Sequence, residues 1–130
     1  MELLNNQYVI DSVPVCDLIR KYGSPLYVYD TSRMERQYKR LEKAFEGSRI
    51  KINYACKALT NINVLRFFKG LGSGLDAVSI QEVNLGLQAG FAPGDILYTP
   101  NCVSLDEINE AVDLGVRINI DSISILEQFG

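Results

Sequence analysis

The chain has 130 residues, 47% of them hydrophobic and 22% charged, a composition typical of a soluble globular domain and not of a disordered or fibrous chain. Its formal net charge of -3 comes from 16 acidic and 13 basic residues without long runs of either sign, so nucleic acid is not an expected partner. Its apolar runs are too short to span a membrane and its N-terminus lacks a signal pattern, so we expect a cytoplasmic protein without a membrane partner.

The first part of the chain predicts short strands and helices. In chain order the expected elements are a strand over residues 7–10, a turn over 11–14, a helix over 15–21 ended by Gly23, and a strand over 25–30. The last of these is predicted from its β-branched and aromatic residues. Asp30 or Thr31 can cap the helix that follows, which extends to about Glu46.

From residue 51 onward, strands and amphipathic helices alternate regularly. The expected strands cover residues 51–57, 74–79, 96–101 and 117–121, and the Ser-x-x-Glu capping pattern opens three of the following helices, at Ser79/Glu82, Ser104/Glu107 and Ser124/Glu127. Such alternation predicts a parallel α/β sheet, either doubly wound or a barrel. A complete barrel needs eight such units in about 250 residues. We therefore expect these four units to be the front half of a longer protein.

The residue types present restrict the chemistry. The chain has no histidine, which excludes Ser-His-Asp and Cys-His catalysis, most zinc sites and the commonest general base from this stretch. Three widely spaced cysteines, Cys16, Cys56 and Cys102, fit neither a disulfide framework nor a zinc ribbon, so we expect reduced thiols and no metal site. Reactions here must use lysine, carboxylates, tyrosine, cysteine or a cofactor.

Glycines at 72 and 74 match the loose dinucleotide-binding pattern G-x-G-x-x-A. That pattern binds a cofactor phosphate only between a strand and a helix, whereas this copy precedes a strand. It therefore indicates a tight helix-to-strand turn.

Lys57 ends the first of the regular strands, and in an α/β barrel the carboxyl ends of the strands form the active site. Alternation places Asn53, Ala55 and Lys57 on one face, with the Ala55 methyl leaving room for a flat ring. The amine of a partly desolvated lysine can form a Schiff base with an aldehyde. The alternative is an ordinary solvated lysine.

Two carboxylates follow on the next unit. Asp76 lies within a strand, where aspartate is disfavoured, so its presence calls for a reason. A carboxylate near a Schiff-base lysine can stabilise the positively charged form of that nitrogen. Glu82 has the competing role of a capping-box acid. Asn101 and Asp121 end the third and fourth strands, where they can lie at the same rim or serve as helix or turn caps.

These motifs resemble those of the fold-type III pyridoxal-phosphate decarboxylases. Tyr54-Ala-Cys-Lys57-Ala58 resembles their Y-A-V-K-A motif, and Gly74-Leu-Asp76-Ala-Val-Ser79-x-x-Glu82 looks like their second-strand motif. Tyr22-Gly-Ser-Pro25-Leu-Tyr-Val-Tyr-Asp30 is similar to the G-[ST]-P-L-Y-V-Y-D signature of the diaminopimelate decarboxylases within that family. Two departures are Cys56 for a common Val and Leu59 for a usual Asn, and the third unit lacks the family's lysine.

The resemblance implies the N-terminal portion of an alanine-racemase-like (β/α)8 barrel over residues 30–130, preceded by a segment of a β-domain over residues 1–29. It implies that Lys57 holds pyridoxal 5'-phosphate as a Schiff base, with Ala55 under the ring and Asp76 beside the lysine. The candidate rim or support residues are Tyr54, Glu82 and Asn101. The implied reaction is decarboxylation of meso-diaminopimelate to L-lysine, in a homodimer with shared active sites.

Other functions stay open. Decarboxylases of ornithine, arginine or carboxynorspermidine share the lysine and aspartate motifs, and a non-catalytic pyridoxal-phosphate-binding protein would share them too. An alanine racemase usually carries A-N-A-Y-G-H after its lysine, and Ala58-Leu-Thr-Asn-Ile-Asn63 argues against it. A dinucleotide-binding half domain is disfavoured by the misplaced glycines.

Overall fold

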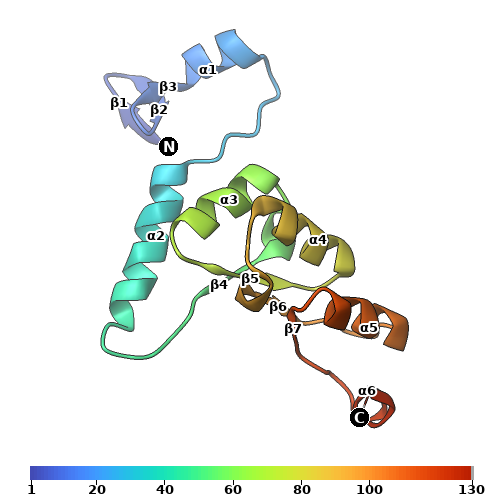
Figure 1. The fold of residues 1–130 in the computed structure, drawn as a ribbon. Helices are drawn as coiled ribbons and strands as arrows, with labels where there is room; N and C mark the ends of the chain where they lie inside the picture. The colour runs from blue at the N-terminus through green and yellow to red at the C-terminus, as the bar shows by residue number, and fades with distance from the viewer. Residues whose placement is uncertain (130) are drawn as a thin grey trace. The chain divides into compact units, whose positions relative to one another are not determined.

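The structure is a computed structural model that describes residues 1–129. The chain divides into two compact units, Met1–Glu46 and Gly47–Gly130, and each is described by itself (Figure 1). Within residues 1–129 no helix is both long and apolar enough to cross a bilayer.

The first unit begins with a three-stranded antiparallel meander. Its elements are β1 (Glu2–Leu4), β2 (Gln7–Ile10), β3 (Val13–Pro14), α1 (Val15–Tyr22) and α2 (Thr31–Ala44). The two hairpin turns place Asn5, Asn6, Asp11 and Ser12 at positive φ, between 48° and 67°. Asn and Asp tolerate this region better than most residues, which suits them to two-residue hairpins. Strands β1 and β3 were not predicted. The Asn and Asp residues of the two turns were the feature of the sequence that could have indicated the hairpins.

The predicted strand at residues 25–30 is wrong. Residues 25–30 form no strand, and none of the strands described in residues 1–129 pairs with them. Leu26, Tyr27, Val28 and Tyr29 are all exposed. Strand propensity reflects packing against neighbouring strands, and here no neighbour is in place. The predicted cap is confirmed, because the Asp30 carboxylate accepts a hydrogen bond from the Arg33 N–H at 2.8 Å.

The second unit contains the four predicted strand–helix units. Its four-stranded sheet is parallel, in the order β4 (Asn53–Ala55), β5 (Gly74–Ala77), β6 (Ile96–Tyr98) and β7 (Arg117–Ile118). The connections contain η1 (Cys56–Ala58), α3 (Ile62–Gly70), α4 (Ile80–Ala89), η2 (Pro93–Asp95), α5 (Leu105–Asp113) and α6 (Ile123–Phe129). Gly72, with φ at +89°, lies in the turn from α3 to β5, which confirms the structural reading of the glycine pattern.

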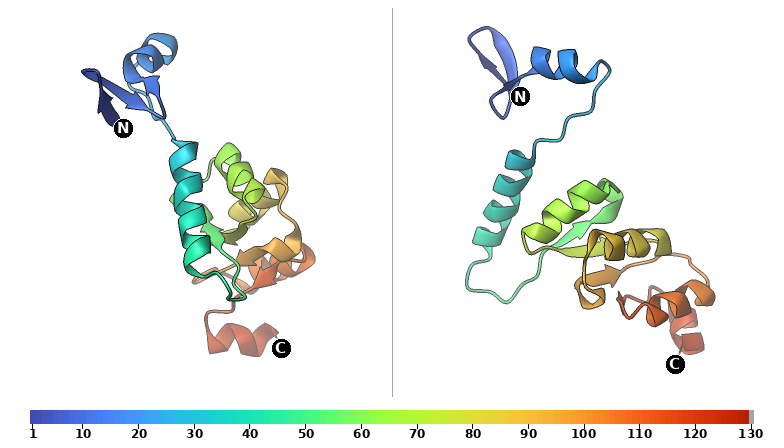
Figure 2. Two further views of the ribbon diagram at one scale, coloured as in Figure 1. Left: turned by 90° about the vertical axis from the view of Figure 1, so that its left-hand side faces the viewer. Right: turned by 45° about the horizontal axis from the view of Figure 1, so that its top comes forward.

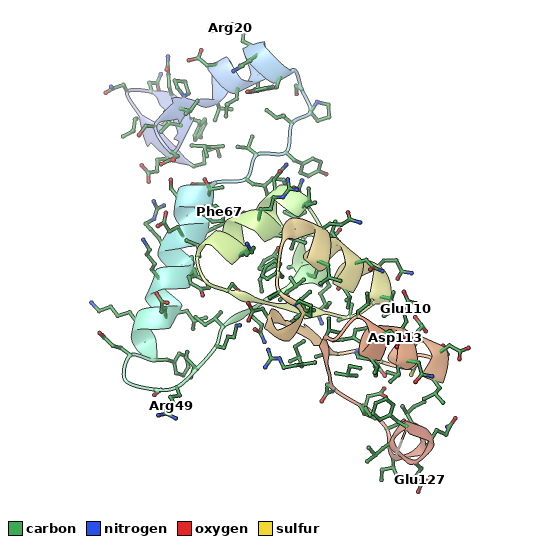
Figure 3. The ribbon with its side chains drawn as sticks, in the orientation of Figure 1. Arg20, Arg49, Phe67, Glu110, Asp113 and Glu127 are labelled. Atoms are coloured by element: carbon green, nitrogen blue, oxygen red, sulfur yellow. The ribbon has the colours of Figure 1, made fainter. Side chains whose placement is uncertain are left out.

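The two faces of this sheet differ in character. Leu75, Ala77, Ile96 and Tyr98 pair across β5 and β6, are completely buried, and belong to the hydrophobic core. Helices α3, α4 and α5 follow one another along that face, as the views in Figure 2 show. The outer side of α5 is acidic, and Glu110 and Asp113 project from it (Figure 3).

The opposite face carries the residues that alternate with the core. Ala55 pairs with Asp76, and Asp76 with Leu97, and all three are half-buried. Paired residues of a parallel sheet project to the same side. The polar Asp76 side chain is therefore on the face away from the helices.

Two of the three predicted serine caps are confirmed. Ser79 accepts from the Glu82 N–H, and Ser104 with Glu107 forms a complete capping box. The prediction for Ser124 is wrong, because Ser124 lies inside α6 and Ser122 accepts from the Ile125 N–H instead. Ser122 also follows the short strand β7 more closely, so the helix starts earlier than the capping pattern indicated.

Replacing Ser104 with alanine is expected to destabilise the protein by about 1 kcal/mol, since an N-terminal N–H of α5 loses its partner. Ser104→Thr keeps the oxygen and should change the free energy of unfolding by less than about 0.5 kcal/mol. Urea unfolding of the two variants measures the difference. Equal effects of the two substitutions would contradict the capping role.

Candidate active site at the carboxyl end of the sheet

Three polar side chains lie where the strands of the parallel sheet end. Lys57 is in η1, directly after β4. Asp76 is in β5, and Thr99 comes directly after β6. The carboxyl ends of parallel strands meet at one edge, which is where α/β barrels carry their active sites. The sequence had singled out Lys57 and Asp76 but not Thr99.

Lys57 is held on a turn and not on the strand itself. Strand β4 ends at Ala55, and the Leu59 N–H donates to the Cys56 carbonyl at 3.1 Å to close η1. The expected strand alternation from Asn53 to Lys57 is therefore wrong past Ala55. The turn buries Cys56 completely and leaves Lys57 exposed. Within residues 1–129 the Lys57 amine takes part in no hydrogen bond or ion pair, so it is available to react.

Tyr54 lies on the helix-covered face of the sheet, and not at the rim. Its ring stacks on Phe68 of α3, with centroids 4.2 Å apart and planes 15° from parallel. Its hydroxyl donates to the Leu59 carbonyl at 3.3 Å, just past η1. Tyr54 thus ties the turn that carries Lys57 to a helix behind the sheet.

Asp76 is oriented by a neighbour from the next strand. The Thr99 hydroxyl donates to Asp76 Oδ1 at 2.6 Å. The Thr99 N–H donates to the Ala77 carbonyl at 2.8 Å and extends the ladder between β5 and β6. This partner explains how a carboxylate is accommodated inside a strand.

Glu82 lies in the first turn of α4 and serves the backbone there. Its Oε2 accepts from the Val78 N–H at 2.9 Å, while its own N–H donates to Ser79 Oγ at 3.2 Å. The expected pairing with the backbone of Ser79 is thus shifted by one residue. A carboxylate at a helix N-terminus is also stabilised by the helix dipole.

The charges of both carboxylates reach the turn that carries Lys57. The pKa of the Cys56 thiol is raised to about 11, first by burial and then by Glu82 and Asp76. Cys56 is the residue next to Lys57. The site therefore presents negative potential at η1, which suits a positively charged nitrogen held there.

Cys56 is expected to resist alkylation in the native protein. With a pKa of about 11, only about one thiol in a thousand is ionised at pH 8, and the side chain is fully buried. Cys16 and Cys102 are exposed. We expect iodoacetamide to label both at least about 100-fold faster than Cys56, as measured by peptide mass spectrometry. Equal labelling of all three in folded protein would contradict the burial of Cys56.

Asn101 and Asp121 are connected through Cys102. The Cys102 N–H donates to Asp121 Oδ2 at 3.2 Å, and the Cys102 thiol donates to Asn101 Oδ1 at 3.3 Å. Neither Asn101 nor Asp121 caps the helix after it, because Ser104 and Ser122 do so. The expectation that Asn101 and Asp121 end strands is wrong, because β6 ends at Tyr98 and β7 at Ile118. Their contacts instead link the connections that follow these strands at the carboxyl edge.

Comparison with known proteins identifies a family that shares this sequence. Residues 31–130 match the family described as pyridoxal-dependent decarboxylase, pyridoxal binding domain. Diaminopimelate decarboxylase of Methanothermobacter thermautotrophicus is 49% identical over 120 residues, covering 91% of this chain and 28% of that protein. The enzyme of Helicobacter pylori is 34% identical over 112 residues, covering 85% of this chain and 28% of that protein. The chain spans less than a third of the curated relatives it matches.

Solved structures agree with the sequence matches. The crystal structure of diaminopimelate decarboxylase from M. jannaschii in complex with L-lysine superposes with a TM-score of 0.90 at 30% identity, covering 97% of this chain and 31% of that one. Lysine/ornithine decarboxylase from Vibrio vulnificus, at 24% identity and a TM-score of 0.81 over 88% of this chain and 31% of that one, shares the fold. The predicted fold, the N-terminal part of a barrel preceded by a β segment, is confirmed.

Proposed function

Because this chain belongs to the pyridoxal-dependent decarboxylase family, we propose that it provides the Lys57 end of the active site of a diaminopimelate decarboxylase. The reaction is loss of CO2 from meso-diaminopimelate to give L-lysine. The observation that carries the proposal is the Lys57 amine at the carboxyl edge of the sheet, which is unengaged by other residues of 1–129. The negative charges of Glu82 and Asp76 act on the neighbouring residue, Cys56. The name of the relatives supports diaminopimelate as the substrate, and the L-lysine in the M. jannaschii crystal supports L-lysine as the product.

The residues at this edge fit pyridoxal 5'-phosphate. Lys57 supplies the primary amine that the aldehyde of the cofactor needs. Ala55 lies two residues before Lys57 and pairs with Asp76 in register. Its small methyl side chain leaves space on the sheet for a flat ring. The carboxylates of Asp76 and Glu82 complement positive charge at η1. When bound, the cofactor's pyridinium ring delocalises the electron pair left when CO2 departs.

The chain's own residues then have distinct tasks. Lys57 would hold the cofactor through Nζ and, when that amine is free, would move a proton at the same atom. Asp76 offers negative charge at the same edge, and Tyr54 fixes the turn through Leu59. Asn101 is proposed as a rim residue because it lies in the connection after β6. We also expect a cytoplasmic homodimer with shared active sites, as the family resemblance implies.

The test uses the intact protein that carries this sequence. Reduction with borohydride followed by peptide mass spectrometry should find a pyridoxyl group on Lys57. The reduced site assigns the cofactor, and CO2 release from diaminopimelate, ornithine and arginine assigns the substrate. An adduct on another lysine would overturn the proposal. Release of CO2 from ornithine or arginine alone would favour a different decarboxylase, and an adduct on Lys57 without CO2 release would favour a non-catalytic binding protein.

A further inference from the structure

The hydrogen bond between Thr99 and Asp76 joins two strands at the proposed cofactor edge. The two residues are 23 positions apart, and the contact between Thr99 Oγ1 and Asp76 Oδ1 is 2.6 Å long and partly buried. The Thr99 backbone is fixed as well, because its N–H donates to the Ala77 carbonyl at 2.8 Å. The hydroxyl is therefore held at a set place relative to the carboxylate.

The Thr99 proton has one preferred acceptor. A hydroxyl carries a single proton, and two oxygens lie within reach: Asp76 Oδ1 at 2.6 Å and the Ala77 carbonyl at 3.5 Å. The carbonyl already accepts from the Thr99 N–H. Hydrogen bonds to a carboxylate are shorter and stronger than those to a carbonyl, so the Thr99 hydroxyl donates to Asp76 Oδ1. The β-branched threonine side chain has few rotamers, which keeps the donor in place.

This bond uses one oxygen of the carboxylate and leaves the other. In the part of the chain that the structure describes, Asp76 Oδ2 has no hydrogen-bond or ion-pair partner. The terminal torsion of an aspartate is broad, so an isolated carboxylate turns freely. Fixing Oδ1 removes that freedom and sets the direction of Oδ2. The charge of Asp76 already acts on Cys56, the neighbour of Lys57.

We propose that Thr99 is a positioning residue that orients the Asp76 carboxylate toward the nitrogen through which Lys57 holds the cofactor. This inference rests on the proposed function. Thr99 itself need not touch cofactor or substrate, because it acts through Asp76. Its hydroxyl is what matters, and its methyl group is replaceable.

The test compares Thr99→Val and Thr99→Ser in the intact protein. Valine keeps the branched shape and the backbone N–H but lacks the donor. We expect Thr99→Val to bind pyridoxal 5'-phosphate about tenfold more weakly, the value of one charge-assisted hydrogen bond. At one fixed pH the ratio of visible to near-ultraviolet absorbance of the bound cofactor should fall about threefold, because the charged nitrogen loses an oriented partner. Thr99→Ser should restore both within about twofold.

A second background separates positioning from simple structural support. In Asp76→Asn protein, Thr99→Val should change affinity and absorbance ratio by less than about twofold, since the carboxylate it orients is gone. Unchanged values in Thr99→Val, failure of serine to rescue, or equal losses in both backgrounds would each overturn the inference. If Thr99→Val does not fold, Thr99→Ala removes the same donor without adding a methyl and gives the same readouts. Absence of a cofactor on Lys57 in the unsubstituted protein overturns the proposed function, and this inference with it.

Discussion

Replacing Lys57 with alanine is expected to remove covalently bound cofactor and to lower decarboxylation by about 10⁴-fold, the upper end of the range for one positioned proton-transfer group. The side chain is exposed on η1 and unengaged by other residues of 1–129, so its loss should leave the fold intact. Absorbance of the bound cofactor and kcat/KM for CO2 release measure the two effects. Circular dichroism checks the fold.

The same strand offers a matched control. Lys51 precedes β4, whereas Lys57 follows it, and Lys51 forms an exposed ion pair with Asp95. That contact lowers the pKa of the Asp95 carboxyl, yet exposed pairs contribute only about 0–1 kcal/mol to stability. Lys51→Ala should therefore retain the cofactor and keep its activity within about twofold. If Lys57→Ala retained the cofactor, or Lys51→Ala lost it, the proposed site at the carboxyl end of the sheet would be wrong.

The elements that could be predicted are those whose causes are local. The capping pairs at Ser79 and Ser104 involve neighbours along the chain. The apolar residues of β5 and β6 are buried in one core, and α4 packs against both strands. The parallel order followed from strand–helix alternation. Lys57 could be chosen because it follows a strand at the edge where α/β barrels carry their active sites, and Asp76 because aspartate is disfavoured inside a strand.

The failures involve partners that are distant along the chain or absent. Residues 25–30 have strand-forming side chains but no neighbouring strand among those described, so propensity alone misled. Lys57 left the strand register because Cys56 turns into the core, a preference visible only once β5 is packed beside η1. Thr99 was missed because its role depends on the register of β5 against β6.

The packing of α4 on β5 leads to a second large effect. Leu75 is fully buried in the core, so Leu75→Ala should destabilise the protein by about 3 kcal/mol. Gly86 of α4 faces it: a Cβ added there would lie 2.4 Å from Leu75 Cδ2 and 3.2 Å from Ile96 Cδ1. Gly86→Ala gains about 1 kcal/mol of helix propensity but overpacks the core by about 2 kcal/mol, a net loss of about 1 kcal/mol.

The two substitutions should compensate each other. In the double variant the alanine methyl at 86 enters space vacated by Leu75, so the clash with Leu75 disappears and part of the cavity is filled. We expect a total loss of about 2 kcal/mol, less than that of Leu75→Ala alone, and a coupling of about 2 kcal/mol. Urea unfolding of the wild type and three variants measures it. Val112→Ala, at a side chain 45% exposed on α5, should change stability by less than about 0.5 kcal/mol. Additive losses would mean that Leu75 and Gly86 do not share this contact, and that α4 is not seated on β5 as described.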